Sequence, residues 1–149
     1  MQKRLYLVLL FGISILSACS YDSEKALKNG DVINMNGPVY NFIYFERFLE
    51  SVEAKEAATV RIANYTPEGN PTLYNVTFDG SVFDFEIDRS KNKKRGDSPA
   101  KENMTCSELA SEEGQQLFSY TLEGCQQDST VESFTILSVL KEQEGEHEH

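Results

Sequence analysis

A change in hydrophobic period, from helical to strand-like, constrains the fold of this chain more than any other feature. Residues 41–57 read NFIYFERFLESVEAKEA, in which Phe42, Phe45 and Leu49 recur at steps of three and four. That spacing places apolar side chains on one face of a helix. Asn41 is a suitable N-cap residue, so the pattern predicts one amphipathic helix over this segment.

Beyond this helix, apolar residues alternate with polar ones, as they do in strands. The alternating segments are TVRIANY (59–65), LYNVTF (73–78) and FDFEID (83–88), and the run VESFTILSVL predicts a last strand. Asp79-Gly80 favours a tight hairpin turn because both residues tolerate positive φ. Residues 89–103 are predicted to form a long polar loop that is basic. The expected fold class is α+β, with one amphipathic helix packed on a mostly antiparallel sheet of about five strands and with a disulfide-linked hairpin.

Residues 1–18 have the features of an export signal. Lys3 and Arg4 precede an apolar run over residues 5–16, a combination typical of secretory signal peptides. The run is too short to span a bilayer, which takes about 20 apolar residues. The segment LSAC (16–19) resembles a bacterial lipobox, and by that resemblance Cys19 becomes the lipid-modified first residue of the mature chain. The alternative is an ordinary signal peptide followed by a chance cysteine.

A diacylglyceryl cysteine carries two acyl chains, which hold a protein on a membrane stably. We therefore expect membrane lipid as a partner through Cys19 and a location on the outer face of the cell membrane. Residues 19–29 are predicted to form a tether and residues 30–140 a single α+β domain. Residues 141–149 have no apolar side chain, so they are predicted to form a disordered acidic tail.

The cysteine count supports the same compartment. Three cysteines would leave an odd thiol in an exported protein, but lipidation of Cys19 leaves Cys106 and Cys125 as a pair. These two bracket a predicted hairpin with its turn at Glu113-Gly114, which indicates a structural disulfide in an oxidising compartment. Two thiols without an internal histidine are too few for a structural zinc site. The C-x-x-C spacing of a catalytic dithiol is also absent.

The charge of the chain limits its partners. It has 24 acidic residues against 14 Lys and Arg, a formal net charge of −10. Such a balance repels phosphate backbones and anionic head groups, so no nucleic-acid partner is expected.

Asp84, Glu86 and Asp88 lie on the same face of one predicted strand, about 6 to 7 Å apart along it. Two interpretations are open. In the first, the face is solvated and partly neutralised by Arg61 or the basic loop. In the second, it forms a site for a basic partner or for Ca²⁺, which favours several oxygen ligands. We treat the three acids only as candidate cation ligands and expect neither a bound metal nor a cofactor.

Several segments resemble a known family. They are GDVINMNGPVYN (30–41), the helix after it, RIANYTPEGNP (61–71) and FDG (78–80). They are similar to small lipoproteins of endospore-forming Gram-positive bacteria that are known as domain of unknown function 4362. The resemblance covers nearly the whole mature domain, including the two late cysteines. It implies a lipoprotein of the bacterial cell envelope and no activity, because none is assigned to the family.

The sequence contains no recognisable catalytic group. Its two histidines, His147 and His149, lie in the tail, whereas nucleophile triads need a base beside the nucleophile. We therefore expect a protein that is not an enzyme: a non-catalytic binding or interaction module that holds an envelope protein or a small ligand. The alternative is a hydrolase that acts on cell-wall glycans through two carboxylates. The available acids are Glu68, Asp79, Asp84, Glu86 and Asp88.

Overall fold

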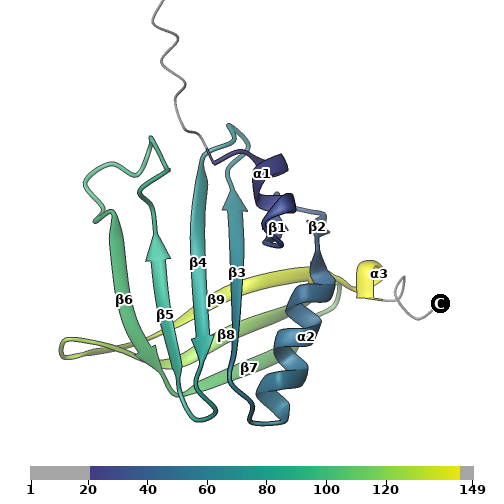
Figure 1. Cartoon of the computed structure of the whole chain (residues 1–149), viewed down its shortest axis with the longest axis vertical. Helices are drawn as coiled ribbons and strands as arrows, with labels where there is room; N and C mark the ends of the chain where they lie inside the picture. The colour runs from purple at the N-terminus through teal and green to yellow at the C-terminus, as the bar shows by residue number, and fades with distance from the viewer. Residues whose placement is uncertain (1–20, 145–149) are drawn as a thin grey trace, which may run out of the picture.

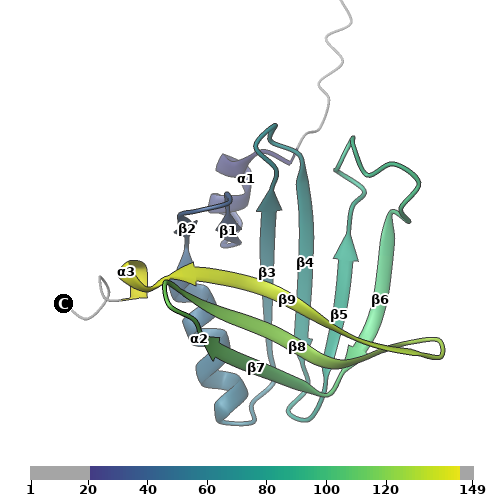
Figure 2. The same ribbon diagram turned by 180° about the vertical axis from the view of Figure 1, so that it is seen from behind.

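The structure is a computed structural model that describes residues 21–144 (Figures 1 and 2). The helices are α1 (Ser23–Lys28), α2 (Phe42–Glu53) and α3 (Lys141–Glu144). The strands are β1 (Val32–Asn34), β2 (Val39–Tyr40), β3 (Ala58–Tyr65), β4 (Pro71–Phe78), β5 (Phe83–Asp88), β6 (Lys101–Cys106), β7 (Glu108–Glu113), β8 (Leu117–Gln127) and β9 (Thr130–Leu140). All nine belong to one sheet in the order β2-β1-β3-β4-β5-β6-β8-β7, and β9 pairs with β8.

The sheet curls so that its two halves face each other. Strands β3 to β6 stand side by side, and β7 to β9 cross them at a steep angle, behind them in Figure 1 and in front in Figure 2. The halves meet at Phe85 on β5 and Phe134 on β9, whose ring centroids are 5.6 Å apart. Helix α2 packs against the second half of the sheet through Phe45, whose ring centroid lies 4.8 Å from that of Tyr120 on β8. The result is a half-barrel with α2 packed at its open side.

The predicted fold class is therefore wrong. The structure is mostly sheet, with nine strands in a curled half-barrel and only small helices, rather than one helix on about five strands. The hairpin predicted about Glu113-Gly114 is present as β7 and β8, although four of the six side chains of β7 are exposed. Strand β6 is an addition to the predicted elements. Only its Met104 and Cys106 are buried, so it shows no clear apolar alternation. The predicted polar loop is correspondingly shorter, because β6 begins at Lys101.

Other predicted elements are confirmed with local differences. Strands β3, β4, β5 and β9 form where the alternation placed them, and α2 begins directly after Asn41. The Asn41 side chain does not cap that helix; it donates to the carbonyl oxygens of Leu27 and Asp31, at 3.2 and 3.0 Å. The turn after β4 is longer than a two-residue hairpin. In it, the Asp79 carboxylate accepts from the backbone N–H of Ser81 and of Val82, both at 2.8 Å.

The sheet buries side chains on both faces. The inner face and α2 form the main core, which includes Val60, Val76 and Phe85. A second, smaller cluster covers the outer face at the end of β3; its members are Tyr21, Ala26, Ile33, Ala63, Tyr65 and Leu73. Residues 21–29, predicted as part of the tether, thus contribute α1 and a fully buried Ala26 to the folded domain.

The described helices are all short, and none of them has the length and apolar character needed to span a membrane. Of the predicted tail, residues 141–144 form α3. The predicted export signal and Cys19 lie outside the described residues, as do residues 145–149.

Candidate functional site

The outer face of β4, β5 and β6, turned away from β7 to β9, carries the predicted acidic ladder. Strand register sets its side chains in rows, because partners in adjacent strands point to the same face. One row contains Thr77, Asp84 and Thr105, and the next contains Asn75, Glu86 and Asn103. The ladder acids are therefore interleaved with amide and hydroxyl groups from the neighbouring strands.

These rows line an open groove of about 710 Å³. The tip of the β8–β9 hairpin, which projects past β6 in Figure 1, forms one end of it. That tip contributes Gln126, Gln127 and Asp128. Nearly all of the groove's outward-facing side chains are amides, hydroxyls or charged groups, which suits a polar ligand better than an apolar one.

A lysine from β6 partly neutralises the negative charge of two ladder acids, Glu86 and Asp88. Lys101 Nζ lies 3.2 Å from Glu86 Oε2 and 3.3 Å from Asp88 Oδ2, and Asn75 Nδ2 donates to Glu86 Oε1 at 2.9 Å. Arg61, which the sequence offered as the neutralising group, pairs elsewhere. Asp84 is exposed, and the hydroxyl of Thr105 donates to it at 3.3 Å. Among the ladder acids, Asp84 is the one without a cationic partner within the described residues.

The proton affinities of the ladder reflect this arrangement. Burial alone would raise the pKa of Asp88, but hydrogen bonds from Ser90 and the ammonium group of Lys101 outweigh it and lower that pKa. The hydrogen bonds to Glu86 and then Asp88 raise the pKa of Lys101. Both groups therefore stay charged near neutral pH.

The ladder does not gather its acids around a point. Within residues 21–144, no three Asp, Glu, His or Cys side chains come close enough together to hold a metal ion. Glu68 and Asp79, the other acids of the hydrolase hypothesis, lie in the turns before and after β4, roughly 25 Å apart at the rise of a strand. The acids named from the sequence thus meet only along β5.

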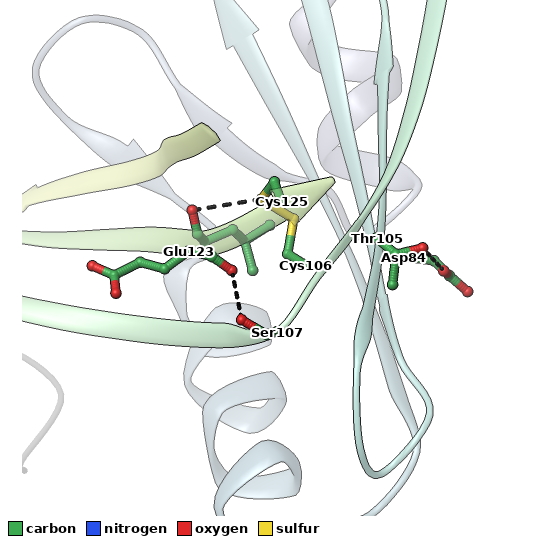
Figure 3. The surroundings of a disulfide bond; sticks show 7 residues. Asp84, Thr105, Cys106, Ser107, Glu123 and Cys125 are labelled. Carbon is green, nitrogen blue, oxygen red and sulfur yellow. Dashed lines mark hydrogen bonds between the residues drawn. A yellow bond between two sulfur atoms is a disulfide. The ribbon is translucent and has the colours of Figure 1, made fainter. Parts of the chain in front are cut away.

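The predicted disulfide is confirmed, and it lies at the corner of the sheet (Figure 3). Cys106 ends β6 and Cys125 lies on β8, and both are buried. Beside them, the backbone N–H and the hydroxyl of Ser107 donate to the carbonyl oxygen of Glu123, at 2.9 and 3.3 Å. Between β6 and β8 the sheet has only one residue pair, Thr105 with Gln126. The disulfide therefore holds the β8–β9 hairpin at the end of the groove.

Sequence reasoning missed a second polar cluster, which joins α1, β1 and β3. Asp31 is 2% exposed and pairs with Arg61, whose Nε lies 2.7 Å from its carboxylate. The hydroxyl of Tyr21 donates to the same carboxylate and accepts from Arg61 Nη2 at 2.9 Å and Asn29 Nδ2 at 3.0 Å. Asp31 and Arg61 both lie in the segments that carry the family resemblance, which was the available signal.

The same cluster shifts the proton affinity of its tyrosines. Burial and a hydrogen bond to Asp31 raise the pKa of Tyr21. Burial, and after it the negative charges of ionised Tyr21 and of Asp31, raise the pKa of Tyr65 to about 12. The hydroxyl of Tyr65 donates to the carbonyl oxygen of Tyr21 at 2.9 Å, which ties the start of the described chain to the end of β3.

Fold and site together define a small domain of one curled, mainly antiparallel sheet, held at its corner by a disulfide and carrying an open polar groove. The chain belongs to the family described as "Domain of unknown function (DUF4362)", whose model matches residues 29–121. The resemblance noted in the sequence is thereby confirmed. The match includes Asp31, Arg61 and Cys106 but ends before Cys125. No curated protein and no solved structure matches the chain.

Proposed function

We propose that this protein is a lipid-anchored extracytoplasmic lipoprotein that acts as a non-catalytic binding module. The observation that carries the binding role is the groove on the outer face of β4 to β6, where Asp84 is exposed among amide and hydroxyl groups. Its ligand is a polar, positively charged segment of an envelope partner.

The charge of the groove favours a cationic ligand. Asp84 and Asp128 are exposed, and Lys101 is already shared between Glu86 and Asp88. An incoming ammonium or guanidinium group would find carboxylate acceptors in the part of the groove that contains Asp84 and Asp128. Charge-assisted hydrogen bonds of this kind are stronger than neutral ones. The surrounding amides offer both donors and acceptors to a peptide backbone.

A non-catalytic role is supported by the way the ladder acids are engaged. Acid–base hydrolysis of glycans uses two carboxylates that flank one bond. Here Glu86 accepts from Asn75 and Lys101, and Asp88 accepts from Ser90 and pairs with Lys101. Lipid attachment is supported by the basic residues, apolar run and LSAC segment of the N-terminus, which together would place the domain on the outer face of the cell membrane.

Calorimetric titration with a hexalysine peptide tests the groove. We expect the double variant Asp84→Asn/Glu86→Gln to bind the peptide roughly tenfold more weakly, which is a loss of about 1.4 kcal/mol. The matched control is Glu50→Gln/Glu53→Gln, which makes the same charge change on exposed positions of α2 and should bind like the wild type.

Two results would contradict the proposal. Equal weakening in both double variants would mean that peptide binding reflects net charge alone and that the groove has no special role. Release of soluble fragments from purified wall glycan by the wild type, abolished in Asp84→Asn/Glu86→Gln, would establish a hydrolase instead.

A further inference from the structure

The loop between β5 and β6 concentrates positive charge in an otherwise acidic chain. Residues 89–100 contain five Lys or Arg and only one acid, Asp97, whereas the whole chain has a formal net charge of −10. The four exposed members are Lys91, Lys93, Lys94 and Arg95. Such a cluster needs an explanation, because solvation alone favours mixed surface charge.

Only the basic residues at the two ends of the loop take part in ion pairs within the described residues. Arg89 pairs with Glu102, and Lys101 pairs with Glu86 and Asp88. Within the described residues, none of the four exposed cations of the loop forms an ion pair, and Arg95 donates only to the carbonyl oxygen of Ser98. The basic loop therefore presents four unpaired cations to the surroundings.

The backbone of the loop is ordered by local hydrogen bonds. The N–H of Arg89 donates to the carbonyl oxygen of Ala100 at 2.7 Å, which closes the base of the loop. Two further turns are closed by backbone hydrogen bonds. The N–H of Asn92 donates to the carbonyl oxygen of Arg89 at 2.9 Å, and the N–H of Arg95 donates to that of Asn92 at 3.3 Å. The cations are thus displayed from a fixed backbone, which lowers the entropy lost when they bind.

The loop lies at the same end of the sheet as the start of the described chain (Figures 1 and 2). Asn92 Nδ2 donates to Thr72 Oγ1 at 3.3 Å, at the beginning of β4. The carbonyl oxygen of Tyr21 accepts from Tyr65 at the end of β3, and Tyr65 pairs with Pro71 on β4. Both the loop and Tyr21 are thereby fixed to one end of the same two strands.

We propose that the basic loop docks on anionic lipid head groups beside the Cys19 anchor, so that the domain is held on the membrane at two points. The inference rests on the proposed lipidation of Cys19. That residue precedes Tyr21 by two positions, a reach of at most about 7 Å. This end of the sheet is therefore held within about one Debye length of the membrane surface.

The net negative charge of the chain does not oppose this contact. Electrostatic interactions beyond about 10 Å are largely screened at physiological salt, so the nearest charges decide the interaction. Each Lys or Arg at an anionic surface strengthens binding by about 1 kcal/mol, or roughly fivefold. Removing three such charges should therefore weaken docking by roughly a hundredfold.

Limited proteolysis of the lipidated protein on vesicles tests the proposal. Trypsin cleaves after Arg95 in the loop and after Lys55, which is exposed in the turn between α2 and β3 at the opposite end of the sheet. On vesicles that contain phosphatidylglycerol, we expect cleavage after Arg95 to be at least tenfold slower than on neutral phosphatidylcholine vesicles. Cleavage after Lys55 should be unchanged, and high salt should restore the rate at Arg95.

Two variants of the same three lysines provide the comparison. Lys91→Gln/Lys93→Gln/Lys94→Gln should lose the protection of Arg95. Lys91→Arg/Lys93→Arg/Lys94→Arg keeps the charge and should retain it. Neither variant changes a side chain that takes part in an ion pair within the described residues.

The outcomes separate this proposal from that of the anchor. A protein that floats with neutral vesicles but shows equal cleavage at Arg95 on both lipids is anchored and has no docking loop, which overturns the inference. A protein that floats only with anionic vesicles, with Arg95 protected, supports the docking loop and contradicts the anchor. Protection by inorganic polyphosphate but not by anionic vesicles would assign the loop to a soluble polymer and overturn the inference.

Discussion

The ion pair between Asp31 and Arg61 offers an asymmetric test of the structure. Asp31 is 2% exposed, whereas the side chain of Arg61 is 36% exposed. Removing either partner breaks the same 2.7 Å contact, but the two remaining charges are left in different environments. Arg61→Met strands a buried carboxylate, and Asp31→Asn leaves an arginine that can turn toward water.

The expected magnitudes follow from this difference. An uncompensated buried charge costs about 3 to 5 kcal/mol, so Arg61→Met should lower the free energy of unfolding by that amount. Asp31→Asn keeps the shape of the side chain and some of its hydrogen bonds, and it should cost about 1 to 2 kcal/mol. The double variant Arg61→Met/Asp31→Asn buries no charge, so it should be more stable than Arg61→Met alone.

Equilibrium unfolding in urea, with the disulfide intact, measures all four proteins. Total stabilities of such domains are about 5 to 15 kcal/mol, so the larger loss would be obvious in the transition midpoint at an unchanged m-value. Equal losses in the two single variants would refute the reasoning from burial. A double variant as unstable as the sum of the two single variants would show that Arg61 and Asp31 do not act as a pair.

Three further predictions concern other parts of the domain. The pKa of Tyr65 is about 12, against a usual value of 10.0, so the folded state holds this proton more tightly than the unfolded state does. About 2 to 3 kcal/mol of stability, present below pH 10, should therefore be lost as the pH rises toward 12. Tyr65→Phe should flatten that decline in alkaline unfolding curves. Gly124 has a φ of +60°, and an added Cβ would lie 2.3 Å from Ser107 Oγ. Gly124→Ala should therefore lower the free energy of unfolding in urea by about 1 to 3 kcal/mol, through both the positive φ and the clash. Recovery of wild-type stability on adding Ser107→Gly would show that the positive φ contributes nothing to the loss. Cys106→Ala/Cys125→Ala opens a loop of sequence separation 19 and should cost about 3 kcal/mol; an unchanged thermal midpoint would show that the disulfide does not stabilise the domain.

Elements with apolar alternation could be predicted, and polar elements could not. Strands β3 to β5 face the main core with one side, so burial imposes a period of two on their sequences. Strand β6 buries only Met104 and Cys106, so its sequence KENMTC carries too short an apolar alternation to predict a strand. Strand β7 has four of its six side chains exposed, and it could be predicted only from the turn at Glu113-Gly114 and the two cysteines, not from its own composition. The sheet is larger than predicted because strands such as β6 leave little hydrophobic pattern in the sequence.

The candidate site was predictable as residues but not as contacts. Asp84, Glu86 and Asp88 share a face, as their spacing required. Which cation neutralises them depended on the order of strands, because β6 places Lys101 beside β5 while β1 places Asp31 near Arg61 on β3. Strand order is a property of the whole fold, and local spacing carries no information about it.

The arrangement of charge also relates the two proposed surfaces to each other. The basic loop and the start of the described chain lie at one end of β3 to β6 (Figure 1). The exposed acids of the groove lie further along the strands, since Asp84 is at the start of β5 and the basic loop follows its end. With the loop against lipid head groups, the strands would stand away from the membrane and the groove would open sideways into the envelope. A cationic segment could then enter the groove without displacing the contacts that hold the domain on the membrane.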